Sequence, residues 1–190
     1  MTKTTIRYSV TKEVHSNYSS FHSDDIKEHY GMDDFYNQSV RIKTFRLPEK
    51  EEAKGLAITL WEREIRLIRK AMGISGGNFL LQLLDAFINY DSDKLYIIST
   101  RYGKSLEEWM NEIEGLWFLK DTNSKSRKEV WTLFKSLLNG IRCLHSAKLL
   151  HRNIHPGVIF FSEEFEENIF KIGGFTWSLY LHNLNFIPKK

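Results

Sequence analysis

The sequence has little cysteine or proline and no long apolar run. Its single cysteine, Cys143, excludes an internal disulfide and every metal site built from several cysteines, and it suits a reducing compartment. Three prolines among 190 residues leave little room for a linker. No apolar stretch approaches the roughly 20 residues that span a bilayer, and "MTKTTIRYSV" lacks the apolar segment of a secretion signal. We therefore expect a soluble, cytoplasmic protein with no membrane partner.

An excess of one charge is absent too. The 27 Lys and Arg residues nearly balance 24 Asp and Glu, for a net charge of +3. Nucleic-acid binding needs basic residues concentrated on one face, so we expect no nucleic-acid partner. The histidines, such as His151 and His155, have no acidic or cysteine ligands at useful spacing, so we expect no metal site.

What is present is an ordinary hydrophobic content of 42%, with 14% aromatic residues, which is enough for one good core. The sequence predicts strands over residues 7–14, 39–45, 77–87 and 93–100. It predicts helices over residues 51–72 and 127–146. A short helix is predicted at "SLEEWMNEI", with Ser105 as its N-cap. A β-hairpin is predicted from the two short strand-like segments "GVIFF" and "NIFKIGGF", with the acidic "SEEFEE" as its turn. This order predicts an α+β fold with an antiparallel sheet.

The helix over 127–146 carries a broad apolar stripe that we expect to be buried on one side. The stripe consists of Val130, Leu133, Phe134, Leu137, Leu138, Ile141 and Leu144. Cys143, on the side of this helix, is expected to be an inert core thiol.

Glu64 lies on the apolar face of the helix over 51–72, where a carboxylate is costly unless a cation meets it. Lys43 alternates with Val40, Ile42 and Phe45 in the preceding strand and is the natural counter-charge. The alternative is that Glu64 lies in water at the edge of the stripe and Lys43 on the exposed strand face. Spacing alone leaves both possibilities open.

These residues resemble a known family. "VRIK" resembles the V-A-I-K strand of protein kinases, with Lys43 as the phosphate-positioning lysine, and "WEREIRLIRK" resembles the helix whose glutamate, here Glu64, holds that lysine. "KLYIISTRYGKSLEEWM" resembles the strand, hinge and next helix. The resemblance implies that the hinge backbone from Thr100 to Tyr102 faces an adenine and that Ser99 lies at the back of the nucleotide pocket. Lys43, Glu64, Ser99, Thr100 and Tyr102 then form the nucleotide pocket that it implies.

"HRNIHP" resembles the catalytic H-R-D-L-K-P, and "KIGGFTWS" resembles the K-I-x-D-F-G-x-S segment. Both depart from the family. Asn153 stands where the family has its catalytic aspartate, and His155 replaces the loop lysine. Val158 and Gly174 stand at the two metal-binding positions, and neither side chain supplies a ligand atom.

The phosphate-covering loop departs as well. The glycine positions of G-x-G-x-x-G fall on "HSNYSS", with His15, Asn17 and Ser20 in place of glycines, and the alignment can shift by a residue or two. Because the base, both metal positions and this loop are lost together, the resemblance implies a pseudokinase. The match covers about residues 8 to 180.

The resemblance implies a kinase-like fold: a five-stranded antiparallel N-lobe sheet with one long helix over residues 1–102, and a partial, mainly helical C-lobe over 103–190. No A-P-E-like segment follows, so we expect a truncated module or a piece of a longer, multidomain chain. "LWEREIRLIRK" and "GGFTWS" also resemble kinase-like modules of large multidomain bacterial proteins, some associated with phage defence.

Three functions remain open at this point. The first is an inactive scaffold or allosteric regulator of attached or partner domains, which leaves room for ATP bound without metal. The second is an atypical Ser/Thr kinase in which acids such as Glu163 or Glu164 reach a metal. The third is an unrelated α+β interaction domain, which a structure with Lys43 far from Glu64 would reveal.

Overall fold

The computed structural model describes residues 7–14, 25–73, 77–111, 124–161 and 170–181, which form two compact units. The first unit comprises Met1–Ile65 and Leu81–Gly103, and the second comprises Arg66–Leu80 and Lys104–Lys190. Among the described residues, no helix combines the length and apolar character needed to cross a membrane.

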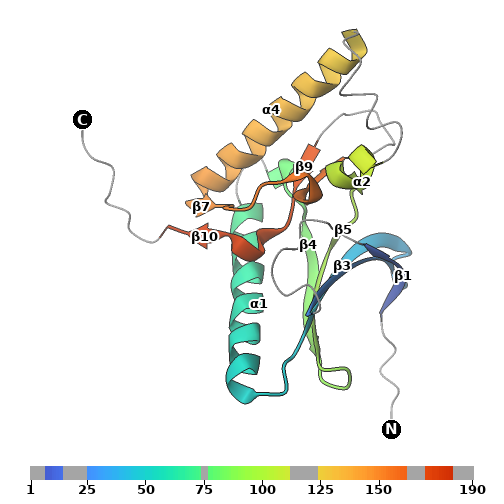
Figure 1. The fold of residues 1–190 in the computed structure, drawn as a ribbon, viewed down its shortest axis with the longest axis vertical. Coiled ribbons are helices and arrows are strands. Elements are labelled where there is room, and N and C mark those ends of the chain that lie inside the picture. Colours follow the sequence, from blue (N-terminus) through green and yellow to red (C-terminus); the bar gives the residue numbers. More distant parts are fainter. Residues whose placement is uncertain (1–6, 15–24, 74–76, 112–123, 162–169, 182–190) are drawn as a thin grey trace, which may run out of the picture. The chain divides into compact units, whose positions relative to one another are not determined.

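The first unit is built on an antiparallel five-stranded sheet in the order β1-β2-β3-β5-β4 (Figure 1). The strands are β1 (Tyr8–Val14), β2 (Ile26–Asp33), β3 (Gln38–Arg46), β4 (Leu83–Asn89) and β5 (Lys94–Thr100). One sheet face buries Tyr8, Val40, Ile42 and Ile98, with Phe87 stacked between Tyr8 and Tyr96. The predicted α+β class with a five-stranded antiparallel sheet is confirmed.

Strand β2 had not been singled out from the sequence. Its residues IKEHYGMD lack the regular apolar alternation that marks a half-buried strand. It forms because it pairs along its whole length with β3, from Ile26 opposite Phe45 to Asp33 opposite Gln38. Its polar side chains find charged partners, as Asp33 does in a two-bond ion pair with Arg7.

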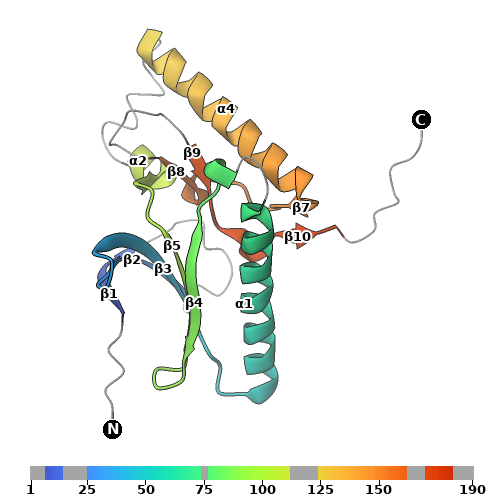
Figure 2. The same ribbon diagram turned by 180° about the vertical axis from the view of Figure 1, so that it is seen from behind.

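Helix α1 (Glu51–Met72) has the bounds predicted from its apolar periodicity (Figure 2). Two glutamates in its first turn and two basic residues in its last turn complement the helix dipole. Within the first unit, the Trp61 indole donates a hydrogen bond to the Tyr96 carbonyl at 3.0 Å, which ties the helix to β5. Its last residues, from Arg66 on, belong to the second unit.

The predicted strand over 77–87 is partly wrong. Gly77–Phe79 form a 3-10 turn, η1, and β4 begins only at Leu83. Between them Leu80, fully buried, pairs with Ile172 of the second unit. The continuous apolar run therefore serves two different contacts, a distinction that periodicity does not encode.

The second unit contains α2 (Leu106–Asn111), α4 (Ser124–Ser146) and short strands. Strands β6 (Lys104–Ser105), β8 (Ile159–Phe161) and β9 (Phe170–Ile172) form one small sheet, and β7 (Leu149–Leu150) pairs with β10 (Leu179–Tyr180). The predicted hairpin is confirmed as the antiparallel β8–β9 pair; its acidic connection lies outside the described residues.

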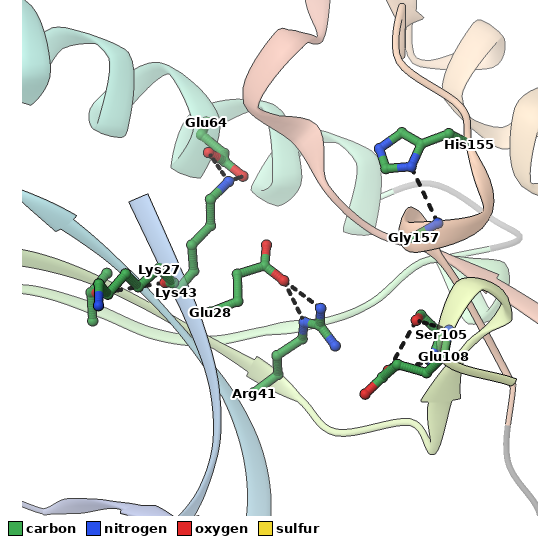
Figure 3. Close-up of polar contacts among 10 residues, drawn as sticks. Lys27, Glu28, Arg41, Lys43, Glu64, Ser105, Glu108, His155 and Gly157 are labelled. Atoms are coloured by element: carbon green, nitrogen blue, oxygen red, sulfur yellow. Dashed lines mark hydrogen bonds and ion pairs between the residues drawn. The ribbon is translucent and has the colours of Figure 1, made fainter. Parts of the chain in front are cut away.

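Ser105 caps α2 as predicted. Its hydroxyl oxygen accepts a hydrogen bond from the Glu108 amide at 3.1 Å, and the Glu108 carboxylate accepts one from the Ser105 amide at 2.9 Å. This reciprocal capping box satisfies two backbone donors at the start of the helix (Figure 3).

The buried face of α4 differs from the predicted stripe. Leu144 is buried, but Val130, Phe134 and Leu138 are about half exposed, as is Trp131. The face that packs consists mainly of small residues: Ser136, Gly140, Cys143, Leu144 and Ala147. A Cβ added at Gly140 would lie 2.8 Å from the Ile172 side chain, so the small residues allow β9 to approach the helix closely. Apolar periodicity did not reveal this face because small residues carry a weak signal.

Cys143 lies in this packed face and is 3% exposed. Burial raises the pKa of its thiol, which keeps the sulfur protonated and unreactive. Its prediction as a core thiol is confirmed.

Candidate functional site

Lys43 and Glu64 form a buried ion pair in the first unit. The lysine Nζ lies 2.9 Å from both carboxylate oxygens of Glu64 (Figure 3). The Glu64 side chain is only 3% exposed and that of Lys43 is 11% exposed. The alternative, with both residues in water, is therefore wrong, and of the two possibilities that spacing left open the ion pair is the one that forms.

The strand and the helix each position one partner. On β3 Lys43 lies opposite Glu28 of β2 and Ile97 of β5, so its backbone is held on both sides. Glu64 is followed on α1 by buried Ile65, Leu67 and Ile68, which anchor that part of the helix. A second ion pair, between Arg41 and Glu28, lies beside the first (Figure 3). Sequence analysis missed this pair, although "VRIK" showed an arginine two residues before the lysine.

The other residues of the implied nucleotide pocket follow along β5. Ser99 lies opposite Arg41, and Thr100 lies opposite Val40. The Thr100 amide donates to the Gln82 carbonyl at 2.9 Å, and its hydroxyl oxygen accepts from the Gln82 amide at 3.3 Å. Tyr102 follows the strand and is half-buried. Their role in nucleotide binding stays a prediction.

In the second unit, His151 organises the loop that resembles the catalytic loop. The backbone amide of Asn153 donates a hydrogen bond to Nδ1 of His151 at 3.3 Å. Nδ1 is therefore an acceptor, and the proton of the neutral ring lies on Nε2. Nε2 then donates to the Gly173 carbonyl at 2.8 Å. Burial lowers the pKa of His151, the hydrogen bond to Gly173 opposes that shift, and His155 adds to it. The ring is therefore held neutral.

The same histidine joins the loop to the segment after β9. Its ring lies 5.4 Å from that of Phe175, which is fully buried. The buried Ser178 hydroxyl donates to the His151 carbonyl at 3.4 Å. Arg152, next in the chain, has a left-handed φ of 68°, a strained conformation for an arginine. The loop is thus closely packed.

Asn153 and His155 stand where the family that the sequence resembles has an aspartate and a lysine. Asn153 is half-buried, and its amide side chain cannot accept a proton as a carboxylate does. His155 turns back on its own chain, because its Nδ1 accepts a hydrogen bond from the Gly157 amide at 3.2 Å (Figure 3). In this position it caps the 3-10 turn η2 (Pro156–Val158).

Val158 and Gly174, the two residues that the resemblance places at metal-binding positions, are in contact with each other. Gly174 has a left-handed φ of 71°, and a Cβ built on it would overlap Cγ1 of Val158 and lie 3.1 Å from its Cβ. The Gly173 amide also donates to the Val158 carbonyl at 2.8 Å. The valine therefore fills the space that an aspartate at position 174 would need.

Several predicted positions lie outside the described residues: His15, Asn17 and Ser20 of the phosphate loop, and Glu163 and Glu164 of the atypical-kinase alternative. Within the part of the chain that the structure describes, no three His, Cys, Asp or Glu side chains gather closely enough to hold a metal ion.

No protein-family model matches the chain. It is similar to calcium-dependent protein kinase 22 of Arabidopsis thaliana, with 25% identity over 169 residues, 83% of this chain and 33% of the relative. It is 30% identical to a probable cyclin-dependent kinase 8 of Dictyostelium discoideum over 142 residues, 73% of this chain and 34% of the relative. A stk11 homolog from the same organism, a serine/threonine-protein kinase, is 26% identical over 145 residues, 76% of this chain and 22% of the relative.

The chain therefore spans about a third or less of the length of these relatives. The similarities agree with the architecture, which combines the five-stranded antiparallel sheet with a long helix whose Glu64 meets Lys43 of β3. Together they show that the chain has a protein kinase-like fold.

Proposed function

We propose that this kinase-like domain is a catalytically inactive pseudokinase that acts by binding, as a scaffold or allosteric regulator of attached or partner domains. The observation that carries the proposal is the contact between Val158 and Gly174. Kinases hold Mg²⁺ with an asparagine and an aspartate at these positions. Here one side chain is apolar, the other is missing, and the valine occupies the space that the aspartate would need.

The catalytic-loop residues support the same proposal. Phosphoryl transfer requires a carboxylate that orients the substrate hydroxyl and accepts its proton. Asn153 has an amide instead, and His155 is bonded to its own loop. Replacing one residue could be compensated by a neighbour, but here the base and both metal ligands are replaced together.

A strip of exposed apolar side chains on α4 supports the binding part of the proposal. Val130, Trp131, Phe134 and Leu138 are each about half exposed. Contiguous apolar residues on a surface mark contacts with other proteins or domains. The resemblance to modules of multidomain proteins favours further domains of the same polypeptide as one class of partner.

The test is a phosphotransfer assay with labelled ATP, using the chain itself and a generic protein as acceptors, with Mg²⁺ and with Mn²⁺. We expect no incorporation above a sample without protein. Incorporation that disappears in Lys43→Ala, and persists in the control Lys94→Ala at an exposed lysine of β5, would overturn the proposal.

A further inference from the structure

Lys43 lies on the face of the β-sheet opposite to the one that buries Val40 and Ile42. Side chains two residues apart on a strand point to the same face, and residues opposite each other in an antiparallel pair share a face. Arg41 therefore lies on the same face as Lys43. Tyr30 is opposite Arg41, and Glu28 is opposite Lys43. All of these residues belong to the first unit.

These side chains bond to one another. Nε of Arg41 donates to a Glu28 carboxylate oxygen at 3.0 Å, and its Nη2 bonds to the same oxygen (Figure 3). The Arg41 side chain is only 8% exposed. The guanidinium carbons of Arg41 and Arg101 lie 5.7 Å and 4.3 Å from the centre of the Tyr30 ring, within the range of cation–π attraction.

Arg41 lies where a bound nucleotide would have to pass. The lysine of a kinase-like strand holds the α- and β-phosphates, and the implied adenine position is at Thr100 to Tyr102. Ser99, which precedes that segment, lies opposite Arg41, two residues before Lys43 on β3. A nucleotide joining the two positions would therefore cross Arg41.

The occupied face is unsuitable for a nucleotide in two respects. The surface that a purine would contact is occupied by the Arg41 side chain, whose guanidinium is bound to the Glu28 carboxylate and lies over the Tyr30 ring. Displacing Arg41 would leave the Glu28 carboxylate without its counter-charge and next to a triphosphate of the same sign.

We propose that Glu28, Tyr30 and Arg41, with the exposed Arg101 over the Tyr30 ring, form a plug that closes the nucleotide-binding face of the sheet. This proposal rests on the kinase-like assignment of Lys43 under the proposed function, and it goes further, because an inactive kinase-like domain can still bind ATP. The plug makes this domain insensitive to ATP, so regulation by partners would not depend on nucleotide.

The experiment measures binding of ATP in EDTA by calorimetry and thermal shift. The test variant is Glu28→Ala with Arg41→Ala, which removes both partners and leaves neither charge unpaired. The matched control is Glu13→Ala with Lys27→Ala, an exposed ion pair between β1 and β2. We expect no ATP binding by the unchanged chain or the control. The test variant should bind at least about tenfold more tightly than either, and adding Lys43→Ala should abolish that gain.

Two results would overturn the plug: ATP binding by the unchanged chain as tight as that of the test variant, or no binding by a test variant whose circular dichroism shows it folded. If the variant fails to fold, the plug is tested instead in the unchanged chain, by following the NMR signals of the arginine Nε–H groups. An unmoved Arg41 signal under millimolar ATP supports the plug, and a shifted one overturns it. Phosphate transfer would instead overturn the proposed function, so the two failures are distinct.

Discussion

The buried polar groups of the sheet in the first unit differ from those around His151 in the second unit. In the first unit, charges are kept and bonded to one another, as in Lys43 with Glu64, Arg41 with Glu28, and Arg7 with Asp33. In the loop of the second unit, buried polar groups are neutral: the His151 ring, the Ser178 hydroxyl and the backbone carbonyls that they meet. The first unit keeps the lysine–glutamate pair that the family resemblance implies, and it adds the Arg41–Glu28 pair beside it.

The difference teaches that buried polar groups can be satisfied either by ion pairs or by neutral hydrogen bonds, with different consequences for substitution. Burying an ion pair costs desolvation free energy for both charged groups. Removing either partner is more costly still, because the other charge is then buried without a counter-charge. Neutral polar side chains need a hydrogen-bond partner but no counter-charge, and His151 and Ser178 find such partners in backbone carbonyls. The comparison yields four predictions.

The largest effect is expected for Lys43→Met, which leaves Glu64 buried without a counter-charge. The free energy of unfolding should fall by about 3–5 kcal/mol, measured by urea denaturation. Adding Glu64→Leu should recover most of the loss, because an apolar pair replaces the ionic one. If Lys43→Met alone were neutral, the contrast between the units would not hold.

Gly174→Ala is expected to cost about 1–3 kcal/mol through overlap with Val158. The left-handed backbone adds about 1–2 kcal/mol. Val158→Ala in the same chain should relieve the overlap, so the two changes together should cost less than the sum of the single changes. Gly55→Ala is the control: a Cβ there meets nothing within 4 Å, and it should stabilise α1 by about 0.5–1 kcal/mol.

Ser105→Ala should lower stability by about 1 kcal/mol, because the capping box loses its side-chain acceptor. The expected readout is a lower thermal midpoint with an unchanged fold by circular dichroism. Ser146→Ala serves as the matched serine, since its hydroxyl donates to the carbonyl of Arg142 on an exposed turn. An equal loss in both variants would contradict a specific role for the cap.

A dependence of stability on pH is expected from the neutral His151 ring. Burial lowers the pKa of His151 in the folded chain, while an unfolded histidine keeps a value near 6.5. Below about pH 6.5 the unfolded state therefore binds more protons, and stability falls as pH decreases towards the folded pKa; above that pH the contribution is constant. Unfolding measured from pH 7.5 to 5 checks this.

His151→Gln should weaken that dependence. Burial also lowers the pKa of His29 in the first unit, which contributes a slope of the same sign. His29→Gln therefore separates the two units. A slope unchanged by His151→Gln would show that folding does not change the pKa of His151.

Much of the fold was predictable where local chemistry and tertiary packing agree. The bounds of α1, the cap of α2 and the β8–β9 pair all followed from the sequence. Strand β2 was not singled out, because its polar residues become strand-like only through their partners on neighbouring strands. The prediction of the buried face of α4 was partly wrong: Leu144 is buried, but Val130, Phe134 and Leu138 are about half exposed. Small residues form much of the packed face, and they leave little hydrophobic signal in the sequence.

The sequence by itself determined which chemical groups exist: a lysine and a glutamate at kinase-like positions, and no carboxylate at Asn153 or Gly174. Only the tertiary structure decided how those groups meet. It placed Val158 in the space beside Gly174 and bonded Arg41 to Glu28 on the face of Lys43. The physical reason is that side-chain identity is local, whereas charge pairing and steric exclusion depend on strand register and on contacts between residues distant in the chain.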